Sequence, residues 1–427
     1  MKRLFAFILI MLVLMNFLVS CGVKQTNKSL TVFFGTFPEV TAQVKKAIAQ
    51  FEQDSGIKVN IYEQLSPTFT TEEFEDYYKK LSAVIMSGEG PDVFISNLDL
   101  SDDIYKMMDA GAFLDFNDLI QSDDSFSIDL YEKKVMDAGI YAGNRYIMPL
   151  NYTVPVAVTT SGKLKEFDVK KEDLLSYERL IDTALVLHDS DKALFTYMWS
   201  YSFSINYLGW LHEMIDYENK TVHLDAVTVD KCTNLIKNER AMRNKYGGIY
   251  EYDHNLAIEY DKGLISLNEV TSTTIMYLSG ARNDDTVEMF PMPNYKGQRT
   301  ASINQFSMIS ASSKNIDNAW SFVKTLLSDD CQSLTSQYSL GIGVKSSLID
   351  KNIDQAIQMH SNKGSIPERY IIELKKIYKE YDNAVLTSLG SSRVFRYWSD
   401  YIFSDNPIDI SELKETVKKE MEFWFNE

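Results

Sequence analysis

Two kinds of hydrophobic pattern alternate along residues 30–95. Apolar or alternating runs predict three buried strands, at 30–34, 57–61 and 92–95. Between them, apolar residues at helical spacing predict two helices, at 40–51 and 77–85. This strand-helix-strand-helix-strand order predicts a parallel sheet with helices packed on its faces.

The carboxyl ends of two expected strands carry candidate binding residues. In sheets of this kind, ligands bind where the strands end. The first strand is followed by Gly35, Thr36 and Phe37. The third strand is followed by Ser96, Asn97 and Asp99. Asp99 has a second interpretation, as the N-cap of a following helix.

The middle and the end of the chain show other patterns. Residues 146–160 alternate and contain two prolines, which indicates an extended crossover. A helical stretch rich in aromatic residues follows and includes Trp199 and Tyr201, for which burial in a core is the competing interpretation. A second extended segment is expected at 301–312, and the chain finishes with helices, the last at 410–425.

The length predicts two lobes. From Thr31 to Glu427 the chain exceeds the roughly 250–300 residues at which a single hydrophobic core stops growing. Its 45% hydrophobic content is enough for well-formed cores and argues against disorder.

The N-terminal residues predict the compartment. Lys2 and Arg3 precede an apolar run at 4–17, which is shorter than the roughly 20 residues of a membrane span and is typical of a secretion signal. The next four residues, 18–21, read Leu-Val-Ser-Cys and resemble a bacterial lipobox. In a lipobox the peptide is cleaved before the cysteine, and that cysteine is acylated.

This resemblance implies a signal peptide at 1–20 and a lipidated Cys21 that opens a polar spacer at 21–30. Two buried acyl chains would hold the protein on the extracytoplasmic face of the cell membrane. The alternative is an uncleaved anchor helix with an incidental cysteine, and it also leaves the rest of the chain outside the cytoplasm. A Gram-positive surface and a periplasm both remain open.

The charge excludes one class of partner. The chain has 43 basic and 60 acidic residues, a net charge of −17, and loss of Lys2 and Arg3 with the leader gives 41 − 60 = −19. Nucleic acid is therefore not expected as a partner, because phosphate binding needs basic clusters. Cys232 and Cys331 are either a disulfide pair or two separate buried thiols.

Signatures of catalysis are missing from the sequence. It has no G-x-S-x-G motif, and His212-Glu213 lacks the second histidine of a zinc-protease helix. We therefore expect no enzyme, no metal and no cofactor. A lipid-anchored glycosidase is the remaining enzymatic alternative, because carboxylate pairs cannot be judged without their separation.

Four segments together indicate a family. They are FEQDSGIKVNI (51–61), SGEGPDVFI (87–95) with AGAFLDFNDLI (110–120), GNRYIMPLNY (143–152), and NIDNAWSFVKTLLSDDCQSL (315–334) followed by GIGVKSS (341–347). In this order the chain resembles a family 1 extracellular solute-binding protein, the lipid-anchored receptor of a bacterial ABC importer for sugars, similar to maltose-binding protein.

The resemblance implies an α/β fold of the two-lobed periplasmic-binding-protein class, type II. Each lobe would hold a mixed, mostly parallel sheet flanked by helices, with the ligand in a cleft between the lobes. One lobe would combine 31–150 with 304–341, and the other would combine 151–303 with 342–427.

The resemblance also implies where the solute binds. Family contacts fall on the loops after the first and third strands, on the crossovers and on aromatic residues of the second lobe. The positions implied here are Gly35, Thr36, Phe37, Ser96, Asn97, Asp99, Asn151, Tyr152, Trp199, Tyr201, Asn268, Glu269, Asn304, Gln305 and Arg393.

The expected function is delivery of a carbohydrate, an oligosaccharide in particular, to ABC permease subunits by a monomeric lipoprotein. Aromatic rings would stack on sugar faces while amides and carboxylates bind hydroxyls. Positions 158–161 and 279–282 depart from the family pattern. A non-sugar solute such as a peptide or polyamine therefore stays open as an alternative.

Overall fold

The computed structural model describes most of the chain from Ser29 onward. The described residues are 29–35, 38–62, 71–96, 103–190, 192–195, 215–224, 230–231, 233–235, 237–238, 263–268, 286–294, 296–333, 341–360, 366–386, 397–398, 401, 404 and 408–426. The leader, Cys21 and Cys232 lie outside them. Cys331 is a free, buried thiol.

The N-terminal strands form the parallel part of a seven-stranded sheet. They are β1 (Ser29–Phe34), β2 (Lys58–Ile61) and β3 (Val93–Ser96), separated by α2 (Pro38–Ser55) and α3 (Thr71–Ser87). β1 pairs in parallel with both β2 and β3. The predicted βαβαβ order is confirmed, because the amphipathic helices cover strands that are themselves almost continuously apolar.

Four later strands complete this larger sheet. They are β6 (Met148–Thr153), β13 (Thr300–Ile309), β14 (Ile342–Gly343) and β15 (Asn383–Leu386), and the order is β14-β6-β13-β3-β1-β2 with β15 also on β13. β13 runs antiparallel to β3 and β6, and β14 runs antiparallel to β6. The sheet is therefore mixed, because the chain leaves it and returns in the opposite direction.

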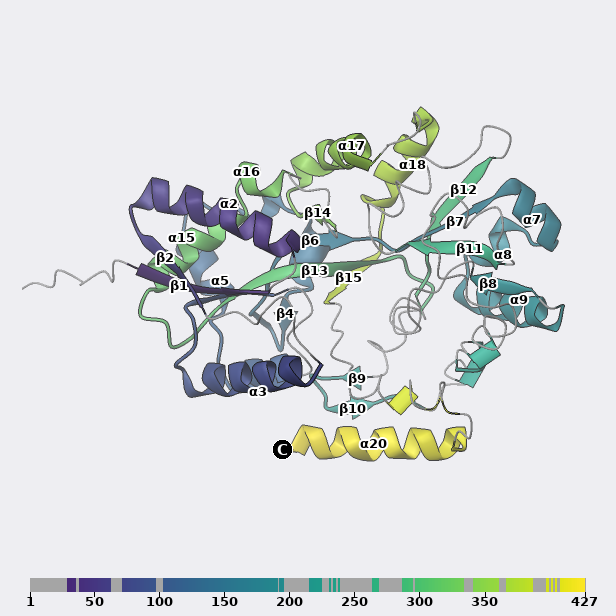
Figure 1. Ribbon diagram of the computed structural model, residues 1–427, viewed down its shortest axis with the longest axis horizontal. Helices are drawn as coiled ribbons and strands as arrows, with labels where there is room; N and C mark the ends of the chain where they lie inside the picture. The colour runs from purple at the N-terminus through teal and green to yellow at the C-terminus, as the bar shows by residue number, and fades with distance from the viewer. Residues whose placement is uncertain are drawn as a thin grey trace, which may run out of the picture.

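Helices cover both sides of the larger sheet. They are α4 (Asp103–Asp109), α5 (Phe116–Gln121), α6 (Lys133–Asp137), α15 (Ile316–Leu326), α16 (Asp329–Gln332), α17 (Ile349–His360) and α18 (Glu368–Ile377), with 3-10 turns η1 (Ile128–Leu130) and η2 (Ser346–Leu348). In Figure 1, α2, α16, α17 and α18 lie above the sheet and α3 lies below it.

A smaller sheet lies at the other end of the molecule (Figure 1). Its strands are β7 (Val156–Thr160), β8 (Ala193–Phe195), β11 (Gly263–Asn268) and β12 (Val287–Pro291), in the order β12-β7-β11-β8. β7 is antiparallel to β11 and β12, so this sheet is mixed but not mostly parallel. Its helices are α7 (Ser161–Phe167), α8 (Lys171–Leu174) and α9 (Tyr177–Asp189).

Two crossings join the sheets. The chain passes from β6 to β7 through Val154 and Pro155, and it returns from β12 to β13. The expected crossover at 146–160 and the extended segment near 301–312 are thus strands that connect the two ends of the molecule.

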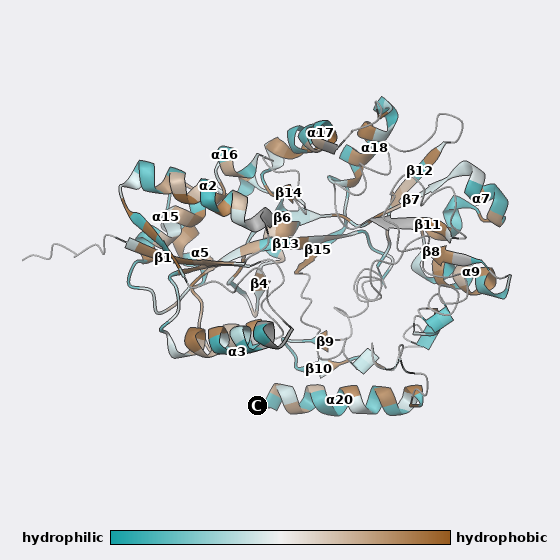
Figure 2. Ribbon diagram, viewed as in Figure 1, coloured by the Kyte–Doolittle hydropathy of each residue, from teal (hydrophilic) through white to brown (hydrophobic). Residues whose placement is uncertain are grey.

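Each sheet has its own apolar core. One cluster of buried side chains surrounds the larger sheet and extends onto β7 and β12 of the smaller sheet. A second packs on the smaller sheet and includes Leu413, Val417 and Met421. These three belong to α20 (Ile410–Asn426), whose residues alternate between hydrophobic and hydrophilic in Figure 2. The hairpin β9 (Ile215–Asp216) and β10 (Thr221–Val222) contacts α20. A second hairpin joins β4 (Ile140–Tyr141) to β5 (Asn144–Arg145).

The described part of 342–386 packs with the larger sheet, whereas the sequence assigned it to the second lobe. β14 and β15 belong to the larger sheet, and α17 and α18 contribute Ile353 and Leu374 to its core. The strand β15 itself was not predicted, since only helices were expected after Gly343. None of the helices within the described residues is long and apolar enough to cross a membrane.

Candidate solute-binding site

Two strand ends meet over the middle of β13. β3 is antiparallel to β13 and ends with Ser96 opposite Phe306, while β15 is parallel to β13 and ends with Leu386 opposite Ile303. Both strands therefore point their carboxyl ends at the two residues between those partners, Asn304 and Gln305. Such ends are where α/β sheets bind ligands.

The pairing of β6 with β13 is irregular at the same place. Ile303 pairs with Tyr152 and Phe306 pairs with Pro149, but between them Gln305 pairs with Asn151. Asn304 on β13 and Leu150 on β6 are thus each one extra residue in the strand pairing. The register before this irregularity is the same as the register after it. Bulges of this kind redirect side chains and are common next to binding sites.

The irregularity brings two buried amides together. The Asn151 amide nitrogen donates to the Gln305 amide oxygen at 2.9 Å, and the two residues are only 9% and 2% exposed. Asn151 Oδ1 and Gln305 Nε2 then have no hydrogen-bond partner within the described part of the chain. Exchanging the oxygen and nitrogen positions of both amides would keep one hydrogen bond between them. One NH₂ group and one carbonyl oxygen would still have no partner within the described part of the chain.

Ser96 adds a hydroxyl to this group. Its side chain is fully buried, and among the described residues its Oγ has no partner either. Burying a polar group without a hydrogen bond costs about 1–3 kcal/mol, so nearly all such groups are paired in folded proteins. Three unpaired groups on adjoining strands, a donor, an acceptor and a hydroxyl, suit a ligand that brings hydroxyl groups of its own.

Glycines permit the close packing beside the amides. A Cβ on Gly341 would lie 2.4 Å from the Tyr152 carbonyl oxygen and 3.2 Å from Asn304 Nδ2. Asn304 is itself buried. Gly35 follows β1, whose last residue Phe34 pairs with Ile95, so Gly35 lies at the same sheet edge as Ser96.

Five predicted site residues are therefore close in the fold. They are Gly35, Ser96, Asn151, Asn304 and Gln305. Asn268 ends β11 and pairs with Val156, the first residue of β7, so it lies just beyond the crossing on the smaller sheet. The other predicted positions, Thr36, Phe37, Asn97, Asp99, Trp199, Tyr201, Glu269 and Arg393, lie outside the described residues.

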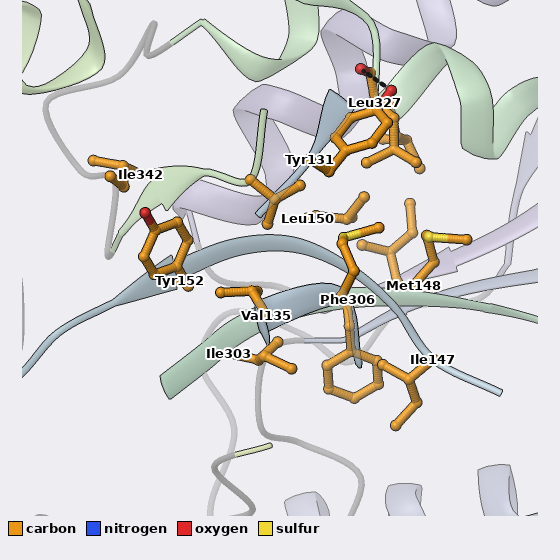
Figure 3. Packing of buried hydrophobic residues seen from close by; sticks show 14 of the residues in the cluster. Tyr131, Val135, Ile147, Met148, Leu150, Tyr152, Ile303, Phe306, Leu327 and Ile342 are labelled. Carbon is orange, nitrogen blue, oxygen red and sulfur yellow. Dashed lines mark hydrogen bonds between the residues drawn. The ribbon is translucent and has the colours of Figure 1, made fainter. Parts of the chain in front are cut away.

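Tyr152 does not join this group. In Figure 3 its ring lies in the core with Leu150 and Ile342, its exposure is 0%, and its hydroxyl donates to the Tyr378 carbonyl at 2.9 Å. Burial, together with the charges of Tyr381 and Glu132, raises the pKa of Tyr152 well above its ordinary value. The hydroxyl thus stays protonated, and Tyr152 anchors β6 to the segment after α18.

Sequence reasoning missed the end of β15. The signal was short: the apolar run 384–386 is bounded by Asp382-Asn383 and by Thr387-Ser388. No group of three metal-ligating side chains occurs in the described ranges. The polar group at β3, β6 and β13 is neutral and has no carboxylate.

Comparison with solved structures supports this architecture. An ABC transporter solute-binding protein from Thermotoga lettingae TMO, bound with α-D-tagatose, is 12% identical, with a TM-score of 0.57 over 93% of this chain and 99% of that chain. A periplasmic oligogalacturonide-binding protein from Yersinia enterocolitica is 12% identical, with a TM-score of 0.60 over 93% and 99%. A de novo designed cysteine esterase also matches, at 12% identity and a TM-score of 0.62 over 94% and 99%.

Similarities at this level of identity establish the fold alone. No curated protein sequence matches the chain. The family model for bacterial extracellular solute-binding proteins, however, matches residues 35–332, which is well over half of the chain. This protein therefore belongs to the family of bacterial extracellular solute-binding proteins.

Proposed function

We propose that this protein captures a carbohydrate, an oligosaccharide in particular, outside the cytoplasm and delivers it to the permease subunits of an ABC importer. The observation that carries the proposal is the group of buried polar atoms on Ser96, Asn151 and Gln305 that have no hydrogen-bond partner among the described residues. Sugar hydroxyls both donate and accept hydrogen bonds, so one ring can satisfy an amide NH₂, an amide oxygen and a serine hydroxyl together. One of the similar structures is bound with α-D-tagatose, and another is of an oligogalacturonide-binding protein.

Among the described residues this polar group is neutral, which favours a sugar over a polyamine. A polyamine would need carboxylates beside its ammonium groups. Glycoside hydrolysis needs two carboxyl groups about 5–9.5 Å apart, one on each side of the scissile bond. The described polar group offers amides and a hydroxyl instead, which suits binding without chemistry.

Replacing Ser96 separates binding from stability. We expect Ser96→Ala to raise the free energy of unfolding of the solute-free protein by about 1 kcal/mol, because it removes a buried hydroxyl that has no partner. The same change should weaken oligosaccharide binding about tenfold, by the loss of one buried hydrogen bond. Chemical denaturation measures the first effect, and calorimetric titration with a panel of oligosaccharides measures the second.

Ser307→Ala is the matched control. Ser307 is equally buried on β13, but its hydroxyl donates to the Met148 carbonyl at 3.4 Å, so its loss should not stabilise the protein or change affinity. A Ser96→Ala protein that is destabilised and binds as well as wild type would contradict the proposed site. Cleaved sugar after incubation with purified protein would instead support the glycosidase, and binding of a peptide alone would change only the solute class.

We also propose that the protein is a lipoprotein anchored through Cys21. The support is the leader, a basic head and an apolar run that end in Leu-Val-Ser-Cys. We expect Cys21→Ala to lose membrane retention and the mass of the acyl chains, because the acylated sulfur is absent. Fractionation and intact-mass measurement test this, with Cys232→Ala as the control that stays anchored. Retention and mass unchanged in Cys21→Ala would contradict lipidation.

A further inference from the structure

Aromatic side chains connect the two lobes at a distance from the crossing strands. Tyr105 on α4 and Tyr217 in the β9–β10 turn stack with ring centroids 3.8 Å apart and planes within 7° of parallel. These residues lie on elements that pack into different apolar cores. α4 contributes Ile104 and Met107 to the core of the larger sheet, whereas the hairpin contributes Ile215 to the core of the smaller sheet.

Further contacts surround the stacked pair. The Tyr141 hydroxyl donates to the Tyr217 carbonyl at 3.3 Å, and the Tyr141 ring meets Tyr105 edge-on at 5.3 Å. On the other side, Trp424 of α20 meets Tyr217 edge-on at 5.9 Å, and Lys106 Nζ lies 4.6 Å from the centre of the Trp424 ring. Tyr105 packs against both apolar cores, so the contacts form one continuous bridge.

This bridge and the crossing strands join the lobes in different places. On the side of α17 and α18, the Val287 backbone nitrogen donates to the Tyr370 hydroxyl at 2.8 Å, and Val287 begins β12, the strand that leads to the second crossing. The β9–β10 hairpin and α20 lie on the opposite side of the larger sheet (Figure 1). A rotation of the lobes about the crossing strands would therefore separate Tyr105 from Tyr217.

We propose that Tyr105, Tyr141, Tyr217, Lys106 and Trp424 form an interlobe clasp that favours the closed arrangement before any solute binds. An aromatic pair contributes about 0.5–1.5 kcal/mol beyond its buried area, which changes a two-state ratio about two- to tenfold. The exposed pair Lys220–Asp109, at 3.8 Å, adds little. The clasp uses none of the polar atoms of the binding site, so it sets the closed fraction whatever the solute is.

The test measures the distance between lobes without a solute. Nitroxide labels on p-acetylphenylalanine at positions 133 and 186 report this distance in the full chain by pulsed electron resonance and leave the native cysteines unmodified. Lys133 lies on α6 and Val186 on α9, and both are exposed. We expect Tyr217→Ala to increase the ratio of the long-distance to the short-distance population about fivefold.

Tyr105→Ala removes the other half of the stack from the opposite lobe. It should produce the same shift, and the double variant should add little to either single change. A shift in Tyr217→Ala that Tyr105→Ala does not share would mean local damage to the hairpin and would overturn the clasp. So would wild-type distances in both variants.

Tyr78→Ala is the matched control. Tyr78 is a half-buried tyrosine on α3 that contacts Tyr77 edge-on at 5.4 Å within one lobe, so its loss should leave the interlobe distance unchanged. A shift of equal size in Tyr78→Ala would show that general loosening, and not the clasp, opens the lobes. Because no sugar is added, these outcomes are independent of whether the proposed solute class is correct.

Discussion

Gly341→Ala should lower the free energy of unfolding by about 3 kcal/mol, at the upper end of the usual cost of overpacking. The new Cβ would lie 2.4 Å from the Tyr152 carbonyl oxygen, a backbone atom of β6 that cannot rotate away. The collision would push β14 off β6 and move Asn304, whose amide lies 3.2 Å from the same Cβ position. Chemical denaturation measures the stability loss, and titration should show weaker solute binding.

Gly56→Ala provides the comparison for a glycine of a different kind. Gly56 directly follows α2 and has a φ of +69°, and a Cβ there would meet no atom within 4 Å. Its replacement should cost only the left-handed backbone strain, roughly 1 kcal/mol, with binding unchanged. Equal losses in the two variants would contradict the steric explanation for Gly341.

Asp92→Ala should be destabilising by about 3 kcal/mol, because one carboxylate connects three segments. It accepts from the Thr31 backbone nitrogen at 2.8 Å, from Ser313 Oγ at 2.6 Å and from Asn315 Nδ2 at 3.3 Å. Hydrogen bonds to a charged group are worth about 1.5–3 kcal/mol each, and partial burial leaves the freed donors incompletely solvated. The unfolding midpoint in denaturant, at an unchanged slope, measures the effect.

The control for this prediction is Asp124→Ala. Asp124 is exposed in the same lobe, so its loss should change the free energy of unfolding by less than about 0.5 kcal/mol. Asp92→Asn should fall between the two, since an amide oxygen still accepts hydrogen bonds but has no charge. A stability for Asp92→Ala that matches Asp124→Ala would mean that these contacts contribute nothing.

Much of the larger sheet could be predicted because its signals are local. β1 and β3 are apolar runs and β2 alternates. Amphipathic helices separate the three strands, and their order alone implies parallel pairing. Hydrophobic period and turn residues act over a few positions, which is the range that a sequence displays directly. The prediction that Gly35 and Ser96 share one sheet edge followed from the same logic and is confirmed.

Segments that join from far along the chain could not be placed in this way. β14 and β15 are two and four residues long, and their partners lie about 190 and 80 residues away. Short strands carry little periodic signal, so the pairing decides whether they exist. For this reason the expected assignment of 342–386 to the second lobe differs from the sheet in which its strands pair.

The role of each polar side chain was also decided by tertiary structure. Asn151 and Tyr152 are neighbours in sequence and were expected to act together, but alternation along β6 sends the amide to Gln305 and the ring into the core. The extra residue at Asn304 shifts the register by one position there, and no sequence pattern displays such a bulge. The sequence by itself determined the family, the parallel strands and the strand ends that carry polar residues. Only the tertiary structure decided which of those residues are buried without partners, because that depends on what a strand 150 residues away places opposite them.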